Sequence, residues 1–173
     1  LSALFADHGR TMHLVREYLA FCWGAPDRRH GTIETYIGRH PHNREKQVVT
    51  RDEERGRHAI THYETEETYG LDKGQPLASL LRCALETGRT HQIRRHFKHV
   101  RHPILCDGRD GDHRHNHMFR DQLGIERLLL VARELTFTHP TSGDRVTIKA
   151  PLGKDFEDAL QKLGFDASVV EKK

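Results

Sequence analysis

A chain of 173 residues, with 31% charged residues and a formal net charge of +3, suits one mildly basic domain with an apolar core. No apolar run approaches the roughly 18 residues that a membrane-spanning helix needs, which excludes that class of protein. The three cysteines, at positions 22, 83 and 106, are too far apart for a C-x-x-C metal or redox motif. We therefore expect reduced thiols and a cytoplasmic location.

The elements expected along the chain are mostly strands. Runs rich in β-branched and aromatic residues, closed by Gly or Pro, predict strands at residues 15–24, 32–38, 46–50, 59–66 and 77–86. A closing hairpin has one strand that ends at residue 137 and a second at 145–149. Helices are expected at residues 116–122 and 156–163, and residues 1–6 form the end of a helix that begins upstream. Residues 39–46 are expected to form a basic loop.

A further helix is expected after Thr90, which could cap it, and it should end at Pro103. Its apolar stripe falls at positions i, i+4 and i+7, which are Ile93, Phe97 and Val100. These elements together predict an α+β domain with a mixed, mostly antiparallel sheet flanked by helices. The domain spans residues 1–165, and residues 166–173 form a flexible tail.

The predicted helix is unusual in its charge. Residues 87–102 contain five Arg or Lys and four His without one Asp or Glu, although like charges on a helix repel. Arg94, Lys98 and Arg101 share one face, which predicts binding of a polyanion such as nucleic acid. The alternative is a solvated face with carboxylate partners from elsewhere, the first of which along the chain is Asp107. The basic loop at residues 39–46 either contacts phosphates as well or is simply solvated.

The histidines raise the possibility of a metal site. His96 and His99 are three residues apart, and His113, His115 and His117 alternate. Zinc accepts such ligands, but the H-E-x-x-H order and Cys partners are absent, and neighbouring Arg and Lys repel a dication. We expect no metal and no cofactor, with these histidines as hydrogen-bonded structural residues or phosphate partners.

Four sequence motifs occur in the order of a known family. The stretch GRTHQIRRHFKHVRHPILCD resembles the GRTHQIR-x-H and HPI-x-GD motifs of RluA-type RNA pseudouridine synthases. VREYLAFCWG is similar to the family's K-x-Y-x-A-x-x-x-G strand, HAITHYE to its K-x-A-x-T-x-Y strand, and RLLLVARELTFTHPTSG to its closing hairpin. RRHFKH and GDHRHNHMFRD look most like the TruC-like branch, which modifies tRNA. The resemblance covers nearly the whole chain.

This resemblance implies an enzyme that breaks the N-glycosidic bond of a uridine in RNA, turns the base and rejoins it through carbon 5. By motif position, the catalytic tyrosine is Tyr18, which stacks on the flipped base, and the arginine that orients an essential Asp is Arg94. The alternatives are that Tyr18 packs in the core and that Arg94 contacts phosphate or forms a surface pair. The residues expected to bind RNA are Arg89, His91, Gln92, Arg95, Lys98 and Arg101.

The chain also departs from the family pattern. The family's essential Asp lies in H-R-L-D-x-x-T-S-G, which does not occur in this sequence, and Asp7 falls in a linker instead. Arg16, Cys106 and Val131 replace the usual Lys, Gly and His. We therefore expect the carboxyl-terminal part of a synthase catalytic domain, incomplete at its amino end, whose nucleophile lies upstream of Leu1.

Two other functions stay open at this point. One is an RNA-binding or assembly paralogue of the same fold without catalysis, and the other is a metal-dependent enzyme that acts on RNA through the histidines. In each case the expected partner is RNA, with tRNA favoured over ribosomal RNA. A monomer is expected.

Overall fold

The structure is a computed structural model that describes residue 6 and residues 13–40, 42–72, 74–165 and 168. Its strands are β1 (Leu14–Trp23), β2 (His30–His40), β3 (Asn43–Thr50), β4 (Gly56–Asp72), β5 (Gln75–Leu85), β6 (Leu130–Thr138) and β7 (Arg145–Lys149). Its helices are α2 (Gln92–His99), α3 (His113–Leu123) and α4 (Lys154–Lys162). None of the described helices is both long and apolar enough to cross a bilayer.

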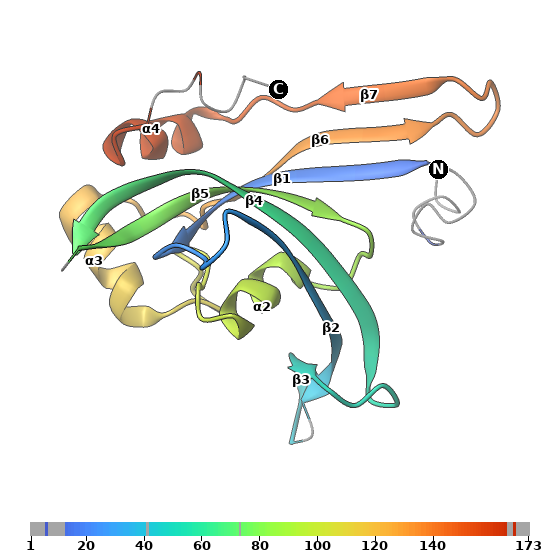
Figure 1. Cartoon of the computed structure of the whole chain (residues 1–173), viewed down its shortest axis with the longest axis horizontal. Coiled ribbons are helices and arrows are strands. Elements are labelled where there is room, and N and C mark those ends of the chain that lie inside the picture. The colour runs from blue at the N-terminus through green and yellow to red at the C-terminus, as the bar shows by residue number, and fades with distance from the viewer. Residues whose placement is uncertain (1–5, 7–12, 41, 73, 166–167, 169–173) are drawn as a thin grey trace.

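The strands form one sheet in the order β3-β2-β4-β5-β1-β6-β7 (Figure 1). The expected α+β class is confirmed, but the described strands pair in antiparallel fashion throughout, so the sheet is not mixed. β1 lies in the interior of the sheet, where Tyr18 is opposite Cys83 of β5 on one side and Ala132 of β6 on the other. The first described strand is therefore held by partners from distant parts of the sequence.

Each face of the sheet has its own apolar core, because alternate residues of a strand point to opposite faces. On one face, Leu19 and Phe21 of β1 are fully buried in a cluster with Phe119 of α3 and Phe156 of α4. Phe21 stacks at a tilt on Phe156, with ring centroids 5.7 Å apart. This cluster fixes α4 against the sheet.

On the other face, Ala20 and Cys22 of β1 pack in a cluster with Ile93 and Phe97 of α2. Figure 1 shows α2 and α4 on opposite sides of the sheet. The predicted apolar stripe of the basic helix is thus confirmed, because Ile93 and Phe97 are buried and Val100 packs against them.

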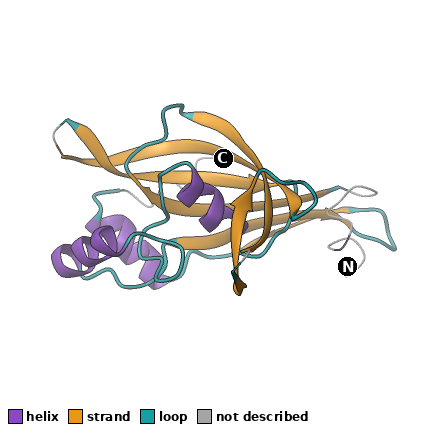
Figure 2. Ribbon diagram, turned by 90° about the horizontal axis from the view of Figure 1, so that it is seen from below, coloured by secondary structure: helices purple, strands orange, loops and turns teal. Residues whose placement is uncertain are grey.

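The β2–β3–β4 end of the sheet bends toward α2, which contacts all three strands (Figure 2). His96 of α2 is fully buried and bonds to Thr35 of β2 at 2.9 Å and to Thr61 of β4 at 2.8 Å. Burial lowers the pKa of His96 to about 4, so this ring is neutral at physiological pH and joins the helix to the sheet without a charge.

The strand predictions and the closing hairpin are confirmed, although most strands begin and end at other residues than expected. The predicted loop at residues 39–46 is wrong, because most of it lies in β2 and β3, with Arg39 opposite Gln47. Polar and basic side chains are common on edge strands, where they discourage pairing with other chains, so composition alone resembles that of a loop. The expected helix at residues 1–6 and the tail at 166–173 lie outside the described residues, apart from residues 6 and 168.

The predicted helix starts were also inexact. Thr90 does not cap α2, since His91, with a left-handed φ of 53°, occupies the N-cap position. The helix ends at His99, before Pro103. α3 begins at His113 and not at residue 116, because the side chain of Asp112 accepts hydrogen bonds from the first free backbone N–H groups.

Replacing Phe156 by Ala tests the core beneath α4. Removing this fully buried ring should lower the free energy of unfolding by about 3 to 5 kcal/mol, because a cavity replaces aromatic contacts. Glu157→Ala, on the exposed side of the same helix, should change it by less than about 0.5 kcal/mol. Urea unfolding followed by circular dichroism gives both values, and equal losses for the two variants would contradict the assigned core.

Candidate functional site

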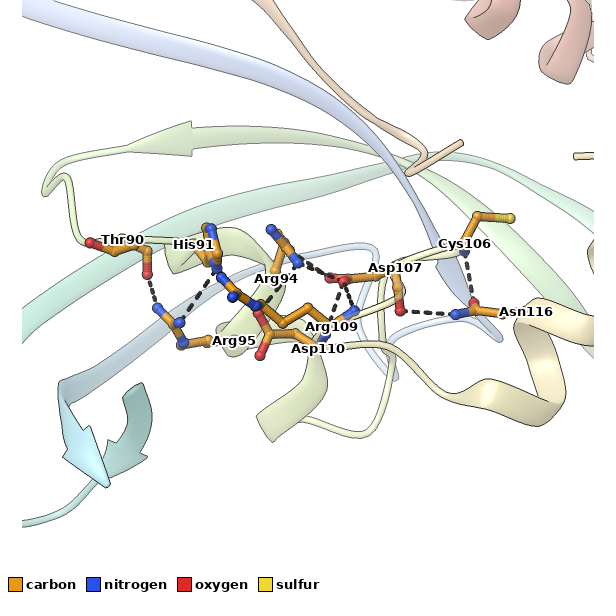
Figure 3. A network of polar contacts seen from close by, with 9 residues as sticks. All are labelled: Thr90, His91, Arg94, Arg95, Cys106, Asp107, Arg109, Asp110 and Asn116. Atoms are coloured by element: carbon orange, nitrogen blue, oxygen red, sulfur yellow. Dashed lines mark hydrogen bonds and ion pairs between the residues drawn. The ribbon is translucent and has the colours of Figure 1, made fainter. Parts of the chain in front are cut away.

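The basic run does have a carboxylate partner, and it is Asp107. The guanidinium of Arg94 donates two hydrogen bonds to this carboxylate, from Nε to Oδ2 and from the second terminal nitrogen to Oδ1, each 2.6 Å long. Asp107 is only 2% exposed. Figure 3 shows the two side chains pointing toward each other from α2 and from the segment that follows it. Arg94 was expected to orient the family's essential Asp, whose motif does not occur in this sequence, so that pairing stays a prediction beside the observed pair with Asp107.

Asp107 is held from several directions. Its Oδ1 also accepts the backbone N–H groups of Arg109 and Asp110, each at 2.9 Å. The side chain of Asn116, from α3, donates to the carbonyl of Asp107 and accepts the N–H of Cys106 (Figure 3). Asp107 therefore joins α2, the loop after it and α3 in one network.

The charges of this pair stabilise each other. Burial alone would raise the pKa of Asp107, but the bonds from Arg94 and from two backbone N–H groups outweigh it and hold the pKa below the ordinary 3.8. The same pair raises the pKa of Arg94. Asp110 lies 3.6 Å from Arg94 and 3.4 Å from Nδ1 of His91, so it adds a second negative charge beside the first turn of α2.

Gln92 and Arg95 were expected to bind RNA, but the structure buries both. The side chain of Gln92 is 2% exposed and bonds to Thr87, Thr61 and two backbone groups, which fixes the turn before α2 against β4. In this conformation the side chain of Gln92 is too buried to contact RNA. Arg95 is 7% exposed and donates to the carbonyl of Thr90.

The other expected RNA-binding residues lie nearer the surface. Lys98 and Arg101 are exposed, and Arg101 follows the helix with a left-handed φ of 68°. Arg89 is half-buried and donates from Nε to the carbonyl of His58 at 2.8 Å. Burial and the neighbouring Arg94 and Arg95 lower the pKa of His91. These residues thus lie along α2 and beyond its two ends, from Arg89 before the helix to Arg101 after it.

Tyr18 lies on the α2 face of the sheet, where it packs half-buried against the cluster that contains Ile93 and Phe97. The pairing with β6 shifts between Glu17 and Tyr18, and such a bulge re-aims a side chain. Tyr18 borders a cavity of about 210 Å³ whose apolar lining residues are Ala132, Leu135, Ile148 and Ala150. Tyr18 and Arg94 therefore belong to the same side of the sheet.

The structure shows the conformation and contacts of Cys106 and Arg16, two residues that depart from the family motifs. Cys106 adopts a left-handed φ of 57°, a conformation that favours Gly, which is the residue usual at this position of the motif. Its buried Sγ lies 3.2 Å from the carbonyl of Ile125. Arg16 is 8% exposed and donates to the carbonyl of Glu86 at 3.2 Å, so it links β1 to the end of β5.

Comparison with known proteins decides the family. Residues 1–99 match the family described as RNA pseudouridylate synthase. This chain belongs to that family. An uncharacterised RNA pseudouridine synthase of Mycobacterium bovis is 42% identical over 151 residues, which are 86% of this chain and 44% of the relative. The ribosomal large subunit pseudouridine synthase D of Neisseria meningitidis serogroup B is 38% identical over 143 residues, covering 80% of this chain and 36% of that protein. The chain thus spans less than half the length of these curated relatives.

Solved structures agree on the fold. Human RNA pseudouridylate synthase domain containing 1 superposes with a TM-score of 0.67 and 25% identity, over 87% of this chain and 58% of the human one. Human RNA pseudouridylate synthase domain containing 4 gives a TM-score of 0.69 at 21% identity, over 95% and 66% of the two chains, and shows the fold alone. The family match and the curated relatives confirm the RluA-type resemblance of the sequence.

Asp107→Asn tests the ion pair between Arg94 and Asp107. Because the folded pKa of Asp107 is depressed, its ionised form stabilises the fold above pH 3.8, and that stability is lost as pH falls through the folded pKa. The variant should lose about 3 kcal/mol at pH 7, since the partly buried Arg94 loses its two-pronged partner and keeps only the more distant Asp110. Its stability should also fall less steeply than that of the wild type in acid.

The matched control is Asp121→Asn, which changes an exposed pair with Arg120. It should alter the free energy of unfolding by less than about 0.5 kcal/mol and keep the wild-type pH profile. Denaturant unfolding between pH 7 and pH 3 measures all three proteins. A wild-type acid profile in Asp107→Asn would show that the pair does not stabilise the fold.

Proposed function

We propose that this chain carries the tyrosine and the RNA-contacting helix of an enzyme that isomerises uridine in RNA to pseudouridine. The observation that carries the proposal is the position of Tyr18 on the same sheet face as α2, packed against the apolar residues that seat this helix. A half-buried aromatic ring beside a small apolar cavity suits stacking on an extruded base. Family membership supports the reaction class.

The proposed reaction needs an attacking carboxylate, and Asp107 is unsuited to that task. Its side chain is buried, and both of its oxygens accept hydrogen bonds from Arg94 and the following backbone. A carboxylate whose oxygens already accept these hydrogen bonds is a poor nucleophile, and its burial keeps it from a uridine of the RNA. We therefore assign Asp107 and Arg94 a positioning role, in which they hold α2 and the adjoining loop in register beneath the RNA.

The reaction is an isomerisation, in which one glycosidic bond breaks and another forms without a net change of oxidation state or composition. We therefore propose that it proceeds without metal or cofactor. We also propose that the protein is a monomer and acts in the cytoplasm. The name of the Neisseria meningitidis relative makes large-subunit ribosomal RNA the first substrate to test. The TruC-like form of the basic helix makes tRNA the second.

Tyr18→Phe tests the proposed catalytic role in the natural protein that contains this sequence. Removing one hydroxyl while keeping the ring should lower kcat on the order of 100-fold, the usual size of a general acid or base contribution, and should leave RNA affinity within about twofold. Tyr69→Phe is the matched control, because Tyr69 packs against the other core cluster, on the opposite face. Its kcat should equal that of the wild type.

Pseudouridine is quantified by mass spectrometry of nucleosides from ribosomal RNA and tRNA after incubation with each protein. Wild-type turnover by Tyr18→Phe would remove its hydroxyl from the chemistry. Tight RNA binding with no pseudouridine formed by the wild type in either RNA would favour the non-catalytic RNA-binding paralogue.

A further inference from the structure

Two basic pockets lie side by side where the β2–β3–β4 end of the sheet meets α2. The first has a volume of about 360 Å³ and is lined by Asn43, Gln47, Val48, Val49, Arg95, Lys98, His99, Arg109 and Asp110. The second, also about 360 Å³, is lined by Ile37, Gly38, Arg39, Gln47, Arg55, Arg57, Gly88, Arg89 and Thr90. Gln47 of β3 belongs to both linings, so the two pockets adjoin at this residue.

The shape of the second pocket depends on two glycines that face each other in neighbouring strands, Gly38 of β2 and Gly56 of β4. A Cβ on Gly38 would lie 1.9 Å from the carbonyl oxygen of Arg55, and a Cβ on Gly56 would lie 2.7 Å from Tyr36. Only Gly therefore lets the turn before β4 pack this closely on β2. The close packing brings Arg55 and Arg57 beside Arg39, in spite of their like charges.

The second pocket keeps an excess of positive charge. None of its described lining residues is acidic, and four of them are arginines. Arg55 does pair with Asp52 at 3.1 Å, and Arg89 donates to a backbone carbonyl, so these two are already engaged. Arg39 and Arg57 are exposed and supply the accessible positive charge.

Arg95 is a buried arginine in the lining of the first pocket. Its side chain is buried, and among the side chains that the structure describes no carboxylate lies within ion-pair distance of it. One terminal nitrogen reaches Thr90 and, at 3.4 Å, Gln47, while Nε is buried without a hydrogen-bond partner. A buried cation with an unsatisfied donor is costly unless an anion approaches it. Lys98 and Arg109 at the same pocket add positive charge, against the single carboxylate of Asp110.

We propose that these two pockets bind two phosphate groups of one RNA strand that passes over Gln47. A strand fits better than two separate anions, because the pockets share a wall, open to solvent and carry the same sign of charge. The contacts would be with the backbone and independent of base sequence. This inference rests on the proposed function, since it assigns the path of the RNA that enters the site beside Tyr18.

Charge removal in each pocket tests the path. Arg57→Gln alters the second pocket and Lys98→Gln the first, and both side chains are exposed, so folding should be unaffected. Each lost phosphate contact should reduce the slope of log affinity against log salt by about 0.7, which is about fivefold weaker binding at about 0.1 M salt. The double variant should lose about twice as much in slope and about 25-fold in affinity. Arg95→Gln should behave like Lys98→Gln if thermal melting shows that it folds.

The matched control is Arg145→Gln, an exposed arginine on β7 at the opposite edge of the sheet. It removes the same charge and should change neither affinity nor slope. Binding is measured by fluorescence anisotropy with a labelled single-stranded uridine-rich RNA, at several salt concentrations. Sodium phosphate at matched ionic strength should not displace the RNA further.

The outcomes separate this inference from the proposed function. Absence of RNA binding by the wild type would overturn both. Wild-type RNA binding with unchanged slopes in Arg57→Gln and Lys98→Gln, or equal losses in Arg145→Gln, would overturn the two-pocket path alone. Specific displacement by inorganic phosphate would assign the pockets to a free anion instead. A smaller slope in both pocket variants, with the control unchanged, supports the path whether or not the protein forms pseudouridine.

Discussion

The buried ion pair between Arg94 and Asp107 connects most of what surrounds the proposed site. It ties α2 to the segment that returns from it, and Asn116 extends the connection to α3. A pair of this kind adds little net stability over apolar packing, because both charges must leave water. The pair instead fixes the orientation of α2 relative to the segment that carries Asp107, because a two-pronged bond between planar groups forms in one orientation only. The helix beneath the proposed RNA path is therefore fixed in rotation as well as in place.

The excess of positive charge after residue 87 is distributed unevenly once the chain folds. Arg94 is compensated by carboxylates, and Gln92 and His96 anchor α2 with neutral bonds. Lys98 and Arg101 keep their charge at the surface. The sheet adds arginines from β2 and β4, which composition near the helix does not reveal. The basic surface is thus a product of the antiparallel arrangement, and only part of it lies on the helix.

The sequence predicted what depends on local pattern. Alternating and β-branched residues located the strands, and the spacing of Ile93 and Phe97 identified the buried side of α2. It could not predict where side chains such as Gln92 would point, because a polar residue beside an apolar stripe can face either way. Gln92 is buried because β4 offers it a backbone carbonyl and a threonine hydroxyl across the sheet. The partner of Arg94 was visible as the first carboxylate after the run, but only the turn at residues 100–106 brings it within reach.

The interior position of β1 has a consequence for how the chain folds during synthesis. One of its neighbours, β6, follows β1 by more than a hundred residues, and Leu14 is opposite Phe137. Contacts so distant in sequence slow folding, because a long loop must close before they form. During synthesis, the apolar residues of β1 stay without their partner strand β6 until the ribosome has also released β2 to β5. During that interval they are a natural site for chaperone binding or for aggregation.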